Sequence, residues 1–375
     1  MDRREFVKMA ALGVGATALA SCTNSNSTGN TDLDSALQSN DLPTLNWEIA
    51  TSWPQGLDTI FGGAVTFADR VTKMTNGKFT MTARAAGEVV PALEILQSAQ
   101  SGAIQAGHTA SYYYLGLSNV NAFGTALPFG LTDRQQNAWL YYGGGLDTMQ
   151  AYYREKFGVI QFPAGNTGVQ MGGWFNKEIK STTDLQGLKF RIPGLGGKVM
   201  EKLGATVQVI PGGEIFQSLQ TGAIDAAEWV GPYDDTKLDF QNVAKFYYYP
   251  GWWEPGPTLE VEIPVKEYDA LPEEYQEVIK TAAAQANVDM MAAYDFKNPA
   301  ALRDNVLNNP NVTMLPFPDD VMQAAEAASF ELYDEYAAAD TDFKSIFEDW
   351  KKFRSDVQAW HSTAELAMLT YKSQV

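Results

Sequence analysis

The alternation of apolar and polar positions predicts a β-α-β unit at the start of the folded body. Residues 45–53 alternate as a half-buried strand does. An amphipathic helix is predicted from about Ile60 to Thr75, and Asn76-Gly77 then turns the chain into a strand over 79–83. A helix between two strands is the usual connection in a parallel sheet, so we expect a mainly parallel sheet.

One segment of the sequence occurs twice, 120 positions apart. Residues 94–106 and 214–226 are identical at nine of thirteen positions. Each copy has the pattern of a helix that ends at a glycine and leads into a short strand. The repeat predicts two lobes of related architecture with a ligand cleft between them. The residues after each copy, 108–114 and 228–229, are therefore expected at that cleft.

The C-terminal part of the chain has the pattern of successive helices. One begins after Pro272 and continues through 281–294, another covers about 318–339, and the last begins near Phe343. Apolar residues of the last helix recur every three or four positions: Phe343, Ile346, Trp350, Phe353, Val357, Trp360, Ala364, Ala367 and Tyr371. This period is typical of a seam against another helix, either in the same chain or in a second subunit of a homodimer.

Composition and charge narrow the class of protein. The chain has 375 residues, 45% of them hydrophobic and 12% aromatic, as expected of a packed globular protein with more than one lobe. Its formal net charge of −18 argues against nucleic acid and anionic lipid as partners. An anionic ligand would therefore have to be attracted by a local positive site.

The N-terminus has the features of an export signal. Arg3-Arg4 precede a short apolar run over 9–20, and the following Leu-Ala-Ser-Cys ends at Cys22, the only cysteine. The paired arginines resemble a twin-arginine signal. Asp2 stands where such signals usually have Ser or Thr, so export by the ordinary secretion route is the alternative. The last four residues resemble a lipoprotein box, which predicts a lipid anchor on Cys22. A plain signal peptide that happens to end near a cysteine is the alternative.

These patterns divide the chain into five parts. Residues 1–22 form the export signal with its lipobox, and residues 23–43 form a polar, flexible tether. Residues 44–165 belong mainly to the first lobe and residues 166–257 mainly to the second. Residues 258–375 supply crossover strands and C-terminal helices that pack on both lobes. The expected location is the periplasm.

Four polar residues lie in apolar or glycine-rich surroundings within 165–257: Gln170, Arg191, Glu228 and Glu254. A buried charge is costly unless it is paired or coordinated, so these side chains indicate one convergent polar site. The planar fork of Arg191 suits a carboxylate held through two oxygens. A structural arginine paired with an internal acid is the alternative.

Oxygen ligands in the same region indicate a hard cation. The Glu228 carboxylate, the Trp229 carbonyl and the Gln170 amide suit Na⁺ or Ca²⁺ better than a transition metal. Glu254 is expected either to ligate this cation or to accept a hydrogen bond from a substrate hydroxyl. Arg191, two glutamates and a monocarboxylate sum to −2, which slightly favours Ca²⁺.

Two tyrosine triplets receive different predictions. At least one residue of Tyr112–Tyr114 should face the core and one should contact a ligand, whereas Tyr247–Tyr249 should be a structural strand.

The sequence contains few signals of catalysis. The two histidines are His108 and His361, and no nucleophile elbow, zinc motif or phosphate loop is present in the sequence. An exported metal-dependent hydrolase that uses Glu228 and Glu254 as an acid/base pair remains the alternative to a binding protein.

Several motifs together resemble the extracytoplasmic solute receptors of TRAP transporters, the DctP-like family. They are Gly-Val-Gln-Met-Gly-Gly-Trp-Phe-Asn-Lys-Glu-Ile (168–179), Leu-Gln-Gly-Leu-Lys-Phe-Arg-Ile-Pro-Gly (185–194), Gly-Ala-Ile-Asp-Ala-Ala-Glu-Trp-Val-Gly-Pro (222–232) and Gly-Trp-Trp-Glu-Pro-Gly (251–256). The similarity extends from about residue 45 to the end. It implies an α/β protein with the two-lobe periplasmic-binding-protein fold, type II-like, with an interlobe cleft and a long C-terminal helix.

The branch that this chain most resembles binds 2-oxo or 2-hydroxy monocarboxylates, such as pyruvate or lactate, with a metal ion. The resemblance implies that Arg191 clamps the carboxylate and that two integral membrane subunits are partners. The expected substrate-binding residues are Asn166, Gln170, Arg191, Tyr113, Tyr114, Trp229 and Glu254. The expected Na⁺ or Ca²⁺ ligands are Gln170, Glu228, Trp229 and Glu254. Some relatives dimerise through the C-terminal helix, whereas the lipoprotein box departs from the commoner soluble form.

Overall fold

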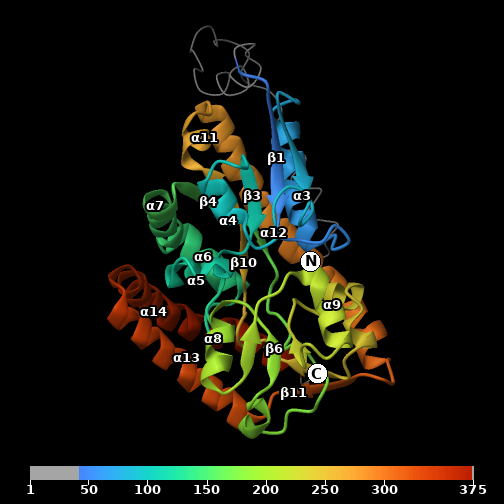
Figure 1. The fold of residues 1–375 in the computed structure, drawn as a ribbon. Helices are drawn as coiled ribbons and strands as arrows, with labels where there is room; N and C mark the ends of the chain where they lie inside the picture. Colours follow the sequence, from blue (N-terminus) through green and yellow to red (C-terminus); the bar gives the residue numbers. More distant parts are fainter. Residues whose placement is uncertain (1–41, 374–375) are drawn as a thin grey trace, which may run out of the picture. The chain divides into compact units, whose positions relative to one another are not determined.

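Two β-sheets organise the part of the chain that the computed structural model describes, residues 42–373 (Figure 1). The predictions for the export signal, for Cys22 and for most of the tether lie outside the described residues. Helices pack against both sheets. The predicted α/β class with two lobes and long C-terminal helices is confirmed.

The first sheet has the strand order β2-β1-β3-β10-β4. β1 (Leu45–Thr51) and β2 (Phe79–Arg84) are parallel and are joined by α3 (Ile60–Met74), which confirms the predicted β-α-β unit. β3 (Ala106–Thr109) is parallel to β1. β10 (Thr258–Pro264) runs antiparallel between β3 and β4 (Val159–Asn166).

The second sheet has the order β11-β9-β5-β8-β6-β7. Its strands are β5 (Trp174–Phe175), β6 (Lys189–Arg191), β7 (Thr206–Gln208), β8 (Ala226–Ala227), β9 (Phe246–Tyr249) and β11 (Thr313–Pro316). β5 is antiparallel to its neighbours, and the other pairs are parallel. The structural strand predicted for Tyr247–Tyr249 is confirmed.

The sequence repeat forms equivalent units in the two sheets. α4 (Ile95–Gln100) leads into β3 of the first sheet, and α9 (Gly212–Gln220) leads into β8 of the second. Gly102 (φ 73°) and Gly222 (φ 71°) have the left-handed backbone that ends a helix and that glycine adopts without a steric penalty. Each lobe therefore presents the end of a short buried strand at the corresponding place.

Two segments carry the chain between the sheets side by side, and we call residues 167–170 and 251–257 the paired crossing segments. Gln170 N donates to Glu254 O (3.2 Å), and Gly251 N donates to Gln170 O (2.9 Å). The first segment leaves β4 and the second enters β10, and these strands are also paired with each other. A 29-residue helix, α12 (Glu273–Ala301), packs on β4, α3 and α10 (Pro232–Lys237).

The predicted seam of the last helix divides into a buried part and an exposed part. α13 (Asp319–Ala339) and α14 (Thr341–His361) lie side by side, and Phe343, Ile346 and Trp350 are buried in the core. A π-helical segment over 362–366 leads to α15 (Ala367–Ser373). Trp360 and Tyr371 are 60% and 66% exposed. The seam therefore packs within the monomer only up to about residue 357.

The remaining α-helices are α5 (Ala122–Thr125), α6 (Asp133–Tyr142), α7 (Gly145–Phe157), α8 (Gly194–Lys202) and α11 (Val265–Asp269). Short 3₁₀ turns form over Ser111–Tyr114 (η1), Asn119–Asn121, Thr182–Leu185 and Phe240–Asn242, and a π-helical turn over Leu302–Leu307 (η5). Within residues 42–373, no helix combines the length and apolar character needed to cross a bilayer.

Candidate ligand-binding site

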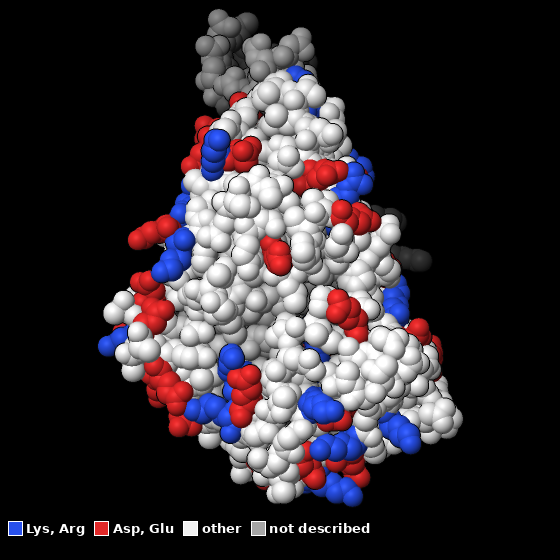
Figure 2. Space-filling view, in the orientation of Figure 1, with Lys and Arg blue, Asp and Glu red and all other residues white. Residues whose placement is uncertain are grey.

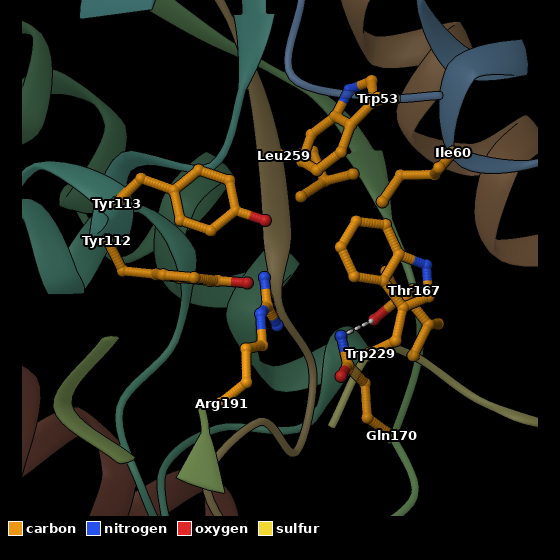
Figure 3. Close-up of a pocket in the computed structure, with 10 residues that line it drawn as sticks. Trp53, Ile60, Tyr112, Tyr113, Thr167, Gln170, Arg191, Trp229 and Leu259 are labelled. Carbon is orange, nitrogen blue, oxygen red and sulfur yellow. Dashed lines mark hydrogen bonds between the residues drawn. The ribbon is translucent and has the colours of Figure 1, made fainter. Parts of the chain in front are cut away.

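A pocket opens between residues contributed by both lobes (Figure 3). The elements of the first sheet contribute Trp53, Ile60, Tyr112, Tyr113 and Leu259. The crossing segment 167–170 contributes Thr167 and Gln170, and the elements of the second sheet contribute Arg191, Trp229 and Val230. The free space inside it is small, about 10 Å³, so the lining residues lie close together in this structure. The cleft predicted from the repeat is thus present, with Tyr112 and Tyr113 on one side and Trp229 on the other.

Arg191 is the only guanidinium in this pocket's lining, and it is held from three sides. It ends β6, is 1% exposed, and donates from Nε to Ile210 O (3.1 Å). Its Nη1 donates to Glu228 O (3.0 Å) and to Glu228 Oε1. Its guanidinium lies over the Trp229 ring at 5.3 Å from the centroid. Both expected features are therefore present, a fork aimed at the pocket and an internal acid paired with it.

Three buried polar atoms around this arginine have no hydrogen-bond partner: Arg191 Nη2, Gln170 Oε1 and Glu228 Oε2. Buried polar groups are usually paired, so a donor and two acceptors left together indicate a ligand with both kinds of partner. An anion would satisfy the guanidinium, and a hard cation would satisfy the two oxygens. The residues present fit Na⁺ or Ca²⁺ together with a carboxylate.

Electrostatics also favour an added positive charge. Burial raises the pKa of Glu228, and Arg191 opposes the rise. Burial and the nearby charge of Glu228 raise the pKa of Glu254 well above its ordinary value. Two carboxyl groups share one guanidinium here, and a cation would stabilise both in their ionised forms.

Glu254 is not among the residues that line the pocket. It is 3% exposed, and its Oε2 accepts a hydrogen bond from Tyr112 OH (3.5 Å). Its backbone carbonyl accepts from Gln170 N, so the paired crossing segments hold Glu254 and Gln170 next to each other. This placement is compatible with a role close to the cation.

The tyrosine triplet separates into pocket and core residues. The hydroxyls of Tyr112 and Tyr113 point toward Arg191 (Figure 3). Burial raises the pKa of Tyr113 to about 12, so its hydroxyl remains a neutral donor. Tyr114, also expected to contact substrate, does not line the pocket: it is 2% exposed in the core and pairs with Thr109 Oγ1 (2.8 Å). Tyr112 takes the expected place instead.

Asn166 is also absent from the wall of the pocket. Its Oδ1 accepts from Gly168 N (2.8 Å), and its Nδ2 donates to Gly256 O (3.3 Å). The side chain is fully buried and connects the two crossing segments. In this structure Asn166 supports the loop that carries Gln170.

Several pocket residues were not selected from the sequence. Trp53 lies two residues after β1, and its Nε1 donates to His108 Nδ1 (2.6 Å), while His108 Nε2 faces Ala164 O (3.2 Å). Burial lowers the pKa of His108 to about 4, so the imidazole is neutral and orients Trp53. The signal that could have identified Trp53 and Thr167 is their position just after a buried strand, where ligands bind in open α/β sheets.

The donor set of the site consists of carboxylate, amide and carbonyl oxygens. Within residues 42–373, no group of three or more His, Cys, Asp and Glu side chains is placed to hold a metal. A cation bound here would therefore use Glu228, Gln170 and backbone oxygen, the mixture that hard cations accept.

Two lobes with a small polar pocket between them are typical of an extracytoplasmic solute-binding protein. Residues 49–340 match the DctP family, described as bacterial extracellular solute-binding protein family 7, and the chain belongs to this family. It is a solute receptor of the TRAP type rather than an enzyme, and the hydrolase alternative has no support.

Known relatives extend the comparison. The chain is 51% identical to the monocarboxylate 2-oxoacid-binding periplasmic protein of Nostoc sp., covering 100% of this chain and 99% of the relative. A TRAP solute-binding protein from Bordetella bronchiseptica, a dimer with calcium and picolinate, is 43% identical (TM-score 0.87; 88% and 98% of the two chains). Another from Pseudoalteromonas atlantica, with sodium and pyruvate, is 40% identical (TM-score 0.84; 87% and 99%).

Proposed function

We propose that this receptor binds a small 2-oxo monocarboxylate of the pyruvate type through Arg191 and a bound Na⁺ or Ca²⁺. The observation that carries the proposal is the unpaired Nη2 of Arg191 beside the unpaired oxygens of Gln170 and Glu228. The relatives named above, which bind 2-oxoacids, pyruvate with sodium, or picolinate with calcium, support the same chemistry.

A 2-oxo acid presents two donor atoms to a cation at once. One carboxylate oxygen and the neighbouring keto oxygen form a five-membered chelate ring, while the second carboxylate oxygen is free for Arg191. We assign Gln170, Glu228 and the Trp229 carbonyl as cation ligands, with Glu254 close by. Tyr113 is assigned to the carboxylate as a neutral hydroxyl donor. A 2-hydroxy acid such as lactate offers the same chelate geometry with a weaker donor.

Delivery requires membrane partners, and we propose the two integral subunits of a TRAP transporter. We further propose that the chain is exported by the twin-arginine route and anchored by a lipid on Cys22 in the periplasm. Mass spectrometry of Cys22 in the membrane fraction, compared with a Cys22→Ala variant, tests the anchor.

The exposed apolar end of the chain supports a homodimer through the C-terminal helices. Trp360, Leu366, Met368, Leu369 and Tyr371 are each more than half exposed. We expect Trp360→Glu with Leu369→Glu to halve the mass measured by light scattering after gel filtration. Leu307→Glu, at a comparably exposed leucine outside this region, should leave the mass unchanged. A wild-type monomer at micromolar concentration would contradict the dimer.

The substrate proposal is tested by thermal unfolding of the refolded, ligand-stripped protein with short 2-oxo, 2-hydroxy and unsubstituted acids. Each acid is tested with Na⁺, with Ca²⁺ and with EDTA. A ligand at a hundred times its dissociation constant adds about 2.7 kcal/mol to the free energy of unfolding. We expect stabilisation by 2-oxo acids that needs a cation and is lost in Arg191→Ala. No stabilisation by any acid in folded protein would overturn the proposal.

A further inference from the structure

A second group of buried acids lies on the strands that join the two lobes. Glu260 and Glu262 are both on β10 and are 1% and 0% exposed. Side chains two positions apart in a strand lie on the same face of the sheet. Glu262 is paired in register with Gln161 on β4, so the Gln161 side chain lies on this face beside Glu262. The three side chains form one buried polar group, separate from the ligand pocket.

Most polar atoms of this group have no hydrogen-bond partner. They are both carboxylate oxygens of Glu262, Oε2 of Glu260, both amide atoms of Gln161 and the hydroxyl of Tyr153 on α7. Gln161 and Tyr153 are each 0% exposed. After burial, the charges of Glu260 and Glu262 are the largest causes that raise the pKa of Tyr153, so its hydroxyl lies close to both acids. Such a concentration of unpaired buried oxygens is unusual in a native protein.

No cationic side chain in the described part of the chain compensates these acids. Burial raises the pKa of Glu260 to about 8, and burial together with the charge of Glu260 raises that of Glu262 well above its ordinary value. A hydrogen bond from Ser111 opposes the rise for Glu260, and no Lys, Arg or His contributes for either acid. The pair therefore lacks the positive partner that Glu228 has in Arg191.

We propose that Glu260, Glu262 and Gln161, with the hydroxyls of Tyr153 and Ser111, hold a second hard cation. Every donor is a carboxylate, amide or hydroxyl oxygen, the set preferred by Ca²⁺ and Na⁺ over transition metals. Two carboxylates balance the charge of Ca²⁺, whereas Na⁺ leaves one of them protonated. The amide oxygen and the hydroxyls supplement the carboxylates, since the group contains only two acidic ligands.

The chain makes room for the Glu260 carboxylate at Gly124. A Cβ on this glycine would lie 2.3 Å from Glu260 Oε1 and 2.5 Å from Ser111 Oγ, so a side chain there would displace both donors. Ser111 directly precedes the pocket residue Tyr112, and Glu260 directly follows the pocket residue Leu259. A cation at this position would join β10, β4 and η1 just behind the ligand pocket.

This second cation is expected to bind without any organic acid, which distinguishes it from the cation proposed in the pocket. The test is equilibrium dialysis of the ligand-stripped mature protein against Ca²⁺ or Na⁺ in a potassium buffer, followed by elemental analysis. We expect one bound cation per chain without acid and a second one when pyruvate is added. The ion that the protein retains in this experiment shows whether the second site selects Ca²⁺ or Na⁺.

Variants separate the two sites. Glu260→Gln with Glu262→Gln should abolish the cation bound without acid, whereas Gln170→Ala should lose only the cation that depends on pyruvate. Glu155→Gln, an exposed glutamate on α7, is the matched control. Wild-type protein that binds no cation without acid, or an unchanged count in the double variant, would overturn the proposal. If the double variant fails to fold, the number of cations that the wild-type protein binds without acid decides whether the proposal holds.

Discussion

At the scale of single residues, Arg191 and Tyr113 show how burial and neighbours determine what a polar group can bind. The Ile210 and Glu228 carbonyls hold the guanidinium in one orientation, and its Nη2 remains free for a ligand. Because the side chain is already ordered, binding costs less conformational entropy. The Tyr113 hydroxyl points toward the same guanidinium (Figure 3). Tyr114, next in sequence, points into the core. Neighbouring residues of one type therefore have different surroundings, one in the pocket and one in the core.

This difference gives a matched pair of substitutions. Tyr113→Phe should weaken pyruvate binding by about five- to tenfold, since one net hydrogen bond contributes roughly 1–1.5 kcal/mol. Tyr114→Phe should leave affinity unchanged and lower thermal stability, because it removes the buried bond to Thr109. Isothermal titration calorimetry with a saturating cation measures the affinities. Equal losses of affinity in both variants would contradict the assignment.

The burial of His108 predicts that the stability of the protein depends on pH. The unfolded chain binds a proton at this imidazole below about pH 6.5, whereas the folded protein does so only below about pH 4. Protonation therefore favours the unfolded state in this window, and the stability present above pH 6.5 is lost as the pH falls toward 4. The free energy of unfolding falls by about 3 kcal/mol over this window, because each unit of difference between the two pKa values corresponds to about 1.4 kcal/mol.

Urea unfolding at pH 7 and pH 4.5 measures this effect. His108→Asn keeps an acceptor for Trp53 Nε1 without the titration, so its stability should depend less on pH than that of the wild type. Other buried acids titrate in the same range, and the difference between the two proteins isolates His108. An identical pH dependence in both would show that His108 is not protonated in this range on unfolding.

At the scale of elements, the N-terminus of α3 and helix α10 connect the lobes beside the pocket. Thr59 Oγ1 donates to Asp234 Oδ1 (2.5 Å), and Tyr294 OH donates to Asp234 Oδ2 (2.6 Å). Asp58 pairs with Lys237 and with Lys297 (2.9 Å). Because α10 begins just after Glu228 and Trp229, we expect these contacts to couple ligand binding to the association of the lobes.

We predict that Asp58→Asn weakens binding two- to fivefold, mainly through faster dissociation. Partly exposed ion pairs contribute about 0.2–1 kcal/mol each, and this substitution weakens two of them, of which the pair with Lys237 on α10 joins the lobes. Asp69→Asn is the control, because Asp69 pairs with Lys73 within α3. Stopped-flow displacement of pyruvate measures the rates. A dissociation rate equal to that of the control would contradict this role.

The elements that depend on local sequence patterns could be predicted from the sequence, whereas the pairing of strands far apart in the chain could not. The β-α-β unit, the repeat and the last helices have strong periodicity over continuous segments. The insertion of β10 between β3 and β4 depends on contacts more than ninety residues apart, which no local pattern specifies. Arg191, Gln170 and Glu228 could be identified because polar residues in apolar surroundings are rare. Tyr112 could not be distinguished from Tyr114, since η1 turns each successive side chain by a third of a circle.

At the scale of the whole molecule, the net charge of −18 opposes the approach of an anionic ligand. On the face shown in Figure 2, acidic and basic side chains are interspersed and much of the middle is uncharged. That face therefore has no broad basic surface to attract a carboxylate. We expect specific attraction to come from Arg191 and the proposed cation within the pocket.

The association rate of pyruvate should consequently rise with ionic strength. Salt screens the repulsion between the protein and the anion, so we expect a severalfold increase between about 10 and 200 mM salt and little change in dissociation. Choline chloride is the appropriate salt, because Na⁺ is a candidate ligand. Stopped-flow fluorescence at saturating Ca²⁺ gives both rates. An association rate that falls with salt would indicate steering by a positive surface.

The meeting of two tryptophans across the pocket has a spectroscopic consequence. Trp53 follows β1 of the first sheet and Trp229 follows β8 of the second, and their rings meet edge to face at 6.4 Å between centroids. Indoles this close couple their electronic transitions, and separation of the lobes would remove that coupling. The near-ultraviolet circular dichroism of the unlabelled protein should therefore report opening and closing directly, without a dye.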